Sequence, residues 1–211
     1  MNWPGQDRWM ALCRSAGANK LESGWYDRLT EAHAEPQRFY HNQQHIAECL
    51  AEFDQARKFA LDPIAVEFAL WFHDVVYDPK AGDNEEQSAA LAKECLINLG
   101  AKHKLADDVA LLIMATKSHE AGTSIDAALM VDVDLSILGR DTKRFFEYEN
   151  QIRNEYQWVP LSVFASKRAE ILKHFLSRER IFVTDWFRNK YEQQARLNLE
   201  ASIIALNRMV P

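Results

Sequence analysis

The chain has 211 residues, 47% of them hydrophobic, and its formal net charge is −6. This length and composition suffice for one domain with a sizeable core and exclude a disordered chain. The acidic balance argues against a nucleic acid polymer as partner, because such binding relies on Lys and Arg meeting phosphates. A small phosphorylated substrate, held by two or three local cations, remains compatible with this charge.

The hydrophobic pattern is helical along nearly the whole chain, which contains only seven glycines and six prolines. Asp62-Pro63 is typical of a helix start, and Gly100 and Gly139 stand where helices are expected to end. The pattern predicts helices over residues 5–16, 19–34, 42–60, 63–77, 84–99, 105–117, 126–138, 142–156, 162–177 and 185–208. We therefore expect an all-α fold.

The three cysteines, Cys13, Cys49 and Cys95, form no CxxC pair, and an odd number is a poor basis for a disulfide framework. Cys49 and Cys95 fall on apolar helical faces, where a thiol acts as a small hydrophobe. We expect a reducing, cytoplasmic location. The N-terminus lacks a basic region followed by an apolar run, and no stretch approaches 18 apolar residues, so neither a signal peptide nor a membrane span is expected.

The first polar cluster lies in RFYHNQQHIAECL, residues 38–50. His45 shares a helical face with Cys49 and Phe53, which indicates that it faces the core. His41 stands at or just before the helix start. A core histidine with a backbone partner is a common alternative for His45, so this cluster alone does not identify a ligand.

The second cluster ends the run IAVEFALWFH, residues 64–73, which is apolar nearly all round and typical of a helix at the centre of a bundle. His73 and Asp74 follow each other at its end. Asp74 could instead cap a neighbouring helix and accept a hydrogen bond from His73. Adjacent helical residues point about 100° apart, so they rarely bond each other, but both can reach an ion between their directions.

The third cluster is SIDAALMVDVDLSILGR, residues 124–140. Asp134 shares a face with Met130 and Leu138, and a carboxylate on an apolar face needs a partner. Asp132 falls on a smaller, more polar face. We expect it to accept a hydrogen bond from a ligand histidine or from Arg140, and not to bind the metal itself.

One divalent metal would satisfy all four buried groups, which are His45, His73, Asp74 and Asp134. Two imidazoles and two carboxylates suit Mn, Fe, Co, Ni or Zn, and Mg is a further candidate.

The order His45, His73-Asp74, Asp134 resembles the H…HD…D signature of the HD superfamily of metal-dependent phosphohydrolases. Six segments, RFYHNQQHI, HDVVYDP, DNEEQSA, ATKSHE, VDVDLSILG and EQQARLNL, resemble one bacterial branch of that superfamily. The resemblance implies a single-domain HD-type helical bundle over residues 1–211. Its motif core would span about 38–140, with the C-terminal helices, 142–208, packed on it. The four signature residues would hold one metal.

The resemblance also implies roles for residues outside the four ligands. An acid shortly after the HD pair orients or deprotonates the attacking water, and Glu85 fits that role best. The alternative for Glu85 is an acid at a helix start. Asp74 could assist the water, and His119 is expected to act as an acid or phosphate contact. The candidates for substrate binding are His41, Arg38, Lys117, Asn84 and Tyr40.

These residues predict a metal-dependent phosphohydrolase acting on a small phosphomonoester or nucleotide, cyclic ones included, through a metal-activated water. The enzyme would be a phosphomonoesterase, nucleotidase or phosphodiesterase, and it could form a homodimer. One alternative is a di-iron HD-type oxygenase, but such a site needs two further histidines between the HD pair and the last Asp of the signature, and His103 and His119 are the only two there. The other alternative is a non-catalytic metal- or nucleotide-binding module. No nucleic acid polymer and no membrane is expected as partner.

Overall fold

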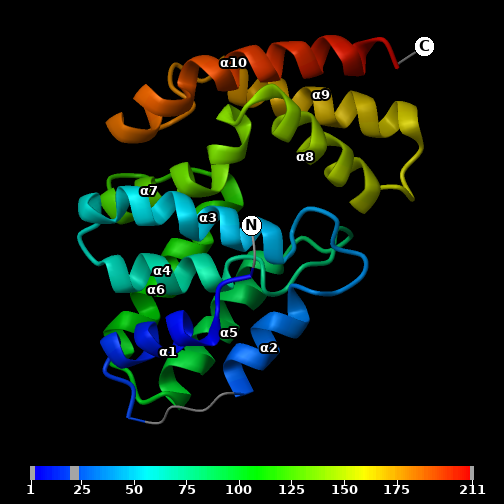
Figure 1. Ribbon diagram of the computed structural model, residues 1–211. Coiled ribbons are helices and arrows are strands. Elements are labelled where there is room, and N and C mark those ends of the chain that lie inside the picture. The colour runs from blue at the N-terminus through cyan, green and yellow to red at the C-terminus, as the bar shows by residue number, and fades with distance from the viewer. Residues whose placement is uncertain (1–2, 20–23, 210–211) are drawn as a thin grey trace. The chain divides into compact units, whose positions relative to one another are not determined.

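The computed structural model describes residues 3–19 and 24–209. Within these ranges every regular element is helical, which confirms the all-α prediction (Figure 1). The α-helices are α1 (Gln6–Ser15), α2 (Gly24–Ala32), α3 (Gln43–Ala56), α4 (Pro63–Phe72), α5 (Asn84–Asn98), α6 (His103–Ser118), α7 (Ile125–Asp134), α8 (Thr142–Glu155), α9 (Leu161–Ser177) and α10 (Asp185–Asn207), and the 3-10 helices are η1 (Arg57–Phe59) and η2 (Leu135–Gly139). Of the helix predicted over 19–34, residues 20–23 lie outside the described ranges.

The helix predicted over 63–77 is wrong at its C-terminal end, because α4 ends at Phe72. The amide of Val75 donates to the carbonyl oxygen of Phe72 at 2.9 Å, a turn that takes the chain out of the helix. Two consecutive β-branched valines also disfavour continuation of a helix. His73 and Asp74 therefore lie in a turn, where their side chains are not held to the 100° separation of neighbouring helical residues.

Two other predicted helices tighten into 3-10 turns before their expected ends. The helix predicted over 42–60 changes at Arg57, where η1 begins. The helix predicted over 126–138 changes at Leu135, where η2 begins, so Asp134 is the last residue of α7. Short 3-10 segments are common at helix ends, and hydrophobic periodicity cannot distinguish them from another α-turn.

The chain divides into two compact units, residues 1–133 and 134–211. In the first unit α4 is central: it packs against α1, α3, α5 and α6, and it lies between α1 and α3 in Figure 1. Every residue of α4 from Ala65 to Phe72 is buried. The Asp62 carboxylate accepts the first free amides of α4, as the sequence predicts for a capping residue before a proline.

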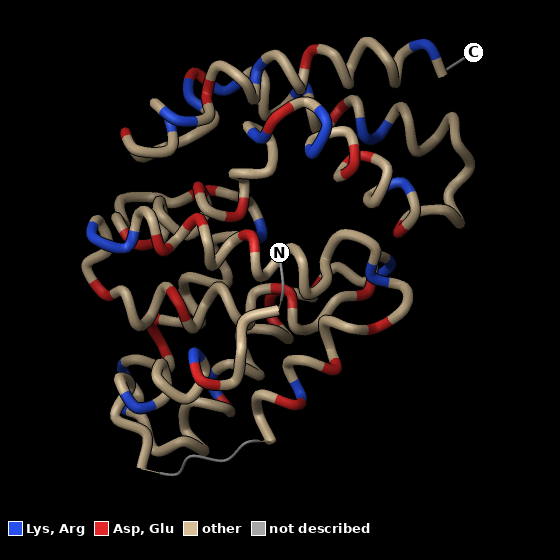
Figure 2. Tube along the Cα trace, in the orientation of Figure 1, with Lys and Arg blue, Asp and Glu red and all other residues tan. Residues whose placement is uncertain are grey.

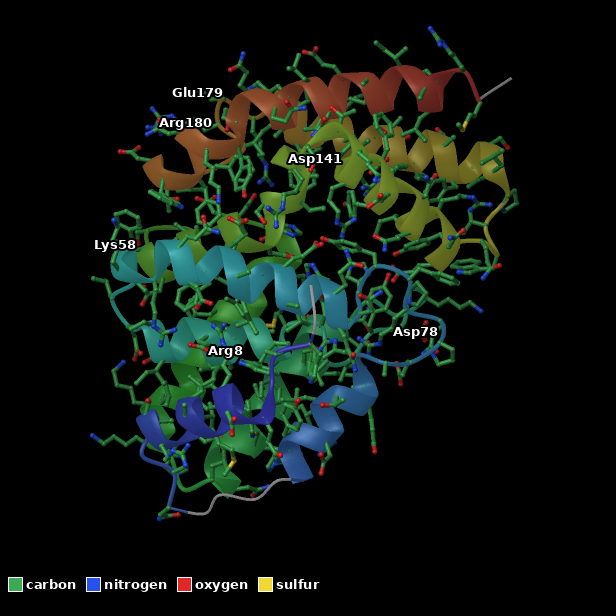
Figure 3. The ribbon with its side chains drawn as sticks, in the orientation of Figure 1. Arg8, Lys58, Asp78, Asp141, Glu179 and Arg180 are labelled. Carbon is green, nitrogen blue, oxygen red and sulfur yellow. The ribbon has the colours of Figure 1, made fainter. Side chains whose placement is uncertain are left out.

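One acid, Glu67, is buried within α4. Arg8 from α1, labelled in Figure 3, donates its Nε to Glu67 Oε1 at 2.8 Å, and Arg57 pairs with the other carboxylate oxygen. A buried carboxylate is tolerated when it is paired in this way. Glu67 therefore anchors α4 to α1 and η1.

In the second unit α10 packs against α8, α9 and η2. The apolar stripe expected on its inner face is buried, as predicted: Phe187, Tyr191, Ala195, Leu199, Ile203 and Leu206. Asn198 interrupts this face, and its Nδ2 donates to the main-chain oxygens of Leu138 and Arg140, both at 2.8 Å. This amide fixes the end of η2, the turn that directly follows Asp134.

Basic and acidic residues are interspersed along the helices of both units, as Figure 2 shows. No helix in residues 3–19 and 24–209 is long and apolar enough to span a bilayer.

Candidate metal centre

Three ligand atoms from two distant segments meet at one point of the first unit. His45 Nε2 lies 3.0 Å from His73 Nε2 and 3.2 Å from Asp74 Oδ2, and His73 Nε2 lies 3.1 Å from the same oxygen. His45 comes from the first turn of α3, while His73 directly follows α4 as its C-cap and Asp74 comes next. Both imidazoles are almost fully buried, and Asp74 is half-buried.

The three distances match those between neighbouring ligands of one metal ion. With bonds of ~2.1 Å, adjacent ligands of an octahedral ion lie ~3.0 Å apart, and those of a tetrahedral ion lie ~3.4 Å apart. The observed 3.0, 3.1 and 3.2 Å are closer to one face of an octahedron. Two imidazoles and one carboxylate on such a face leave the opposite positions open, as in the two-histidine, one-carboxylate metal sites.

The tautomer of His73 is set by its second ring nitrogen. His73 Nδ1 lies 3.1 Å from the carbonyl oxygen of Leu70, which can only accept a hydrogen bond. Nδ1 therefore carries the proton and Nε2 presents its lone pair to the cluster. A main-chain carbonyl behind a histidine ligand orients the ring and raises its basicity.

The charge state of Asp74 also fits a ligand. Burial by itself raises the pKa of the Asp74 carboxyl, but the positive charge that His73 and His41 carry when protonated, with hydrogen bonds from His45 and His73, outweighs burial and holds this pKa well below its usual range. The carboxyl group is therefore ionised at neutral pH, the form in which carboxylates bind metals.

Four residues, His45, Cys49, His73 and Asp134, could together hold a metal ion, because each offers a ligand atom within 4.8 Å of the others. The cluster contains Asp134, which is half-buried, and not Asp132, which is fully buried. The grouping includes the aspartate that the sequence predicts as a ligand, although Asp132, expected on the more polar face, is the more deeply buried of the two. That Asp132 accepts a hydrogen bond from a ligand histidine or from Arg140 stays a prediction.

Cys49 is the member of this cluster that was expected to be only a small hydrophobe. The signal was its spacing, because a residue four positions after His45 lies on the same helical face. Cys49 Sγ is 3.7 Å from His45 Nδ1 and 3.8 Å from His45 Nε2. The structure thus adds Cys49 as a further candidate ligand, while the predicted ligand Asp74, which lies close to both imidazoles, is not a member of this group of four.

Two further predicted residues lie beside the cluster. The ring of Tyr40 is 4.7 Å from the ring of His45, centre to centre, and the ring of His41 is 6.0 Å from it. His41 also stacks on Tyr77, with ring centres 4.1 Å apart and planes inclined by 27°. The structure thus brings His41 and Tyr40 to the candidate site, and it adds Tyr77.

The predicted substrate contacts Lys117 and Asn84 have protein partners. The ammonium of Lys117 pairs with Glu86 and donates to the main-chain oxygen of Gly82 at 2.8 Å. The hydrogen bond that Lys117 donates to the Glu86 carboxylate raises the pKa of Lys117. The side chain of Asn84 exchanges two hydrogen bonds with the main chain of Asp78, marked in Figure 3, at 2.9 and 3.0 Å. Both residues stabilise the loop that leads from the turn of His73 and Asp74 to α5.

The predicted catalytic residues Glu85 and His119 lie at helix ends. Glu85 is half-buried in the first turn of α5. His119 follows α6 with φ of 50°, the one positive φ of a non-glycine residue in the described ranges. Histidine is among the residues enriched in this left-handed region, and such conformations gather at functional sites. Their catalytic roles stay predictions.

The comparisons give no further assignment: no family model matches the chain, and neither the curated proteins nor the solved structures contain a match. What is established is therefore an all-helical chain with a histidine and carboxylate cluster that could hold a metal ion.

Proposed function

We propose that the protein is a metal-dependent phosphohydrolase of the HD type. One divalent ion would be held by His45, His73, Asp74 and Asp134, with Mn, Fe, Co, Ni, Zn or Mg as the candidates. The observation that carries the proposal is the triangle of His45 Nε2, His73 Nε2 and Asp74 Oδ2, with edges of 3.0, 3.1 and 3.2 Å. The H…HD…D resemblance supplies the phosphohydrolase part of it.

When bound, such an ion activates water and polarises a phosphoryl oxygen. The chain's own residues would complete the chemistry. Asp74 or Glu85 would accept the proton of the attacking water. His41, His119 or Lys117 would stabilise negative charge on the leaving side, with the arrangement fixed before substrate arrives.

The substrate would be a small phosphomonoester or a nucleotide, cyclic nucleotides included. The aromatic rings of Tyr40, His41 and Tyr77 lie beside the cluster and would suit a flat group on the substrate. The net charge of −6 supports a small substrate over a polymer. A reducing, cytoplasmic location is part of the proposal, and it fits three buried cysteines that form no disulfide.

The test is a screen of chelated protein against nucleotides and phosphomonoesters, supplied in turn with each of the six metals, with phosphate release as the readout. We expect release that depends on the metal and is absent from a His45→Ala variant. Nucleotide binding with no phosphate release under any metal would favour the binding module. An iron-to-protein ratio near two with oxygen consumption would favour the oxygenase.

A further inference from the structure

Arg38 connects the two segments that surround the candidate metal. It lies in the turn before α3 and is almost fully buried. Its Nη1 donates to the main-chain oxygen of Asp74 at 2.5 Å and to that of His41 at 3.3 Å. Its Nη2 donates to the main-chain oxygen of Val75 at 2.9 Å. One guanidinium group thus binds the turn after α4 at two residues, Asp74 and Val75, which lie 36 and 37 positions further along the sequence.

These carbonyl groups need such a partner. The turn after α4 continues neither the helix nor another regular element, and buried carbonyl oxygens without a donor are costly. A guanidinium offers several donors in one plane, which a lysine cannot replace. The Glu35 carboxylate accepts a fourth hydrogen bond, from Arg38 Nε at 2.8 Å.

We propose that Arg38 is the positioning residue of the metal centre. By fixing the main chain at Asp74 and Val75, the guanidinium fixes where the Asp74 carboxylate stands relative to His45 and His73. By donating to the main-chain oxygen of His41, the same guanidinium also holds His41, whose ring stacks on Tyr77, in a fixed position relative to the cluster. The inference rests on the metal site of the proposed function and is independent of which phosphoester is hydrolysed.

A direct substrate contact is the role that the sequence suggests for Arg38, and the structure supports it poorly. The side chain of Arg38 is 2% exposed. Its donors already meet Glu35 and three main-chain oxygens. A phosphate would have to displace these bonds to reach the guanidinium.

The experiment measures the dissociation constant of Mn or Zn by chelator competition, without substrate. Arg38→Lys keeps the charge but loses the planar fork, and we expect metal binding to weaken about 10–100-fold, as for other groups that orient ligands. In Arg38→Ala, millimolar guanidinium ion should restore part of the affinity, while sodium should not. Arg28→Lys, the same change at an exposed arginine of α2, is the matched control and should bind metal like the wild type.

Activity adds a second readout. A positioning role predicts a lower kcat with little change in KM for Arg38→Lys at saturating metal. Unchanged metal affinity together with a raised KM would overturn the proposal in favour of a substrate contact. If Arg38→Ala does not fold, as judged by circular dichroism, Arg38→Lys and Glu35→Gln remain, and Glu35→Gln should weaken metal binding less than Arg38→Lys does.

The two proposals fail in different ways. Metal binding that depends on Arg38 in a chain that hydrolyses no phosphoester would overturn only the phosphohydrolase. A wild-type chain that binds no divalent ion would overturn both.

Discussion

His45 Nε2 and His73 Nε2 lie 3.0 Å apart although 28 positions of sequence separate the two residues. Because His73 Nδ1 faces the oxygen of Leu70 and carries the proton of its ring, His73 Nε2 presents a lone pair, which can accept one hydrogen bond from His45 Nε2 or bind a metal ion. A metal ion uses the lone pairs of both nitrogens and the nearby Asp74 oxygen at once.

Metal removal should lower the stability of the protein. An ion that binds only the folded chain stabilises it by mass action, by about 2.7 kcal/mol at 100 times its dissociation constant. The melting temperature should therefore fall when a chelator is added and recover with Mn or Zn. His103→Ala, a change at an exposed histidine of α6, should respond like the wild type. An unchanged melting temperature, on protein shown to contain metal beforehand, would contradict a buried site.

Asp132 and Asp134 should differ in their effect on metal content. Asp134→Ala removes a member of the cluster and should lose bound metal and activity together. Asp132→Ala should retain metal, with affinity or activity reduced about 10–100-fold at most, as for groups that orient ligands. Elemental analysis of both variants measures this directly. A metal-free Asp132→Ala beside a loaded Asp134→Ala would show that the two aspartates were assigned the wrong way round.

Glu85→Gln should separate chemistry from metal binding. The amide cannot accept a proton from water, so turnover should fall about 10²–10⁴-fold, the usual contribution of an acid–base group. Bound metal should stay at the wild-type level, because Glu85 is outside the ligand cluster. Glu94→Gln makes the same change at an exposed site of α5 and should retain both properties. Full activity of Glu85→Gln would leave this residue as an acid at a helix start.

His33 should make the protein sensitive to acid. Its ring is fully buried, and burial, with a smaller contribution from Arg38, lowers its pKa to about 3. Between its ordinary pKa of about 6.5 and this value the unfolded chain binds a proton that the folded chain does not. The stabilisation by neutral His33 is therefore complete above about pH 6.5 and is lost as the pH falls, by up to about 1.4 kcal/mol per pH unit.

Urea unfolding at pH 7 and pH 5 tests this effect. His33→Gln, whatever its stability at pH 7, should lose less free energy of unfolding between the two pH values than the wild type. His103→Gln, at an exposed position, should retain the wild-type dependence. Equal pH dependence in all three proteins would rule out His33 as the cause.

Gly139 should not tolerate a side chain. A Cβ atom there would stand 2.4 Å from the Cβ of Tyr191 and 2.8 Å from its main-chain oxygen. Forcing η2 away from α10 should lower the free energy of unfolding by about 1–3 kcal/mol, the usual cost of overpacking. Gly82→Ala, where nothing lies within 4 Å of the added atom, is the control. Equal stability of the two variants would mean that η2 shifts freely.

Local patterns in the sequence determined the all-α class and the approximate positions of most helices. The stripe on α10 and the cap at Asp62 depend on residues three or four positions apart, which is the range over which a helix brings side chains together. The same spacing predicted that His45 faces the core and that Asp134, rather than Asp132, points to the cluster.

The tertiary structure decided where α4 ends and what surrounds the HD pair. The hydrophobic periodicity predicted a helix as far as residue 77, but α4 ends at Phe72. The turn that follows is held by Arg38, which comes from a distant segment, so no local sequence pattern indicates this contact. The same holds for Asn198, whose amide fixes η2 from 58 and 60 positions away. Such bonds form only when packing brings distant main-chain oxygens within reach of one side chain, so the residue type alone cannot show them.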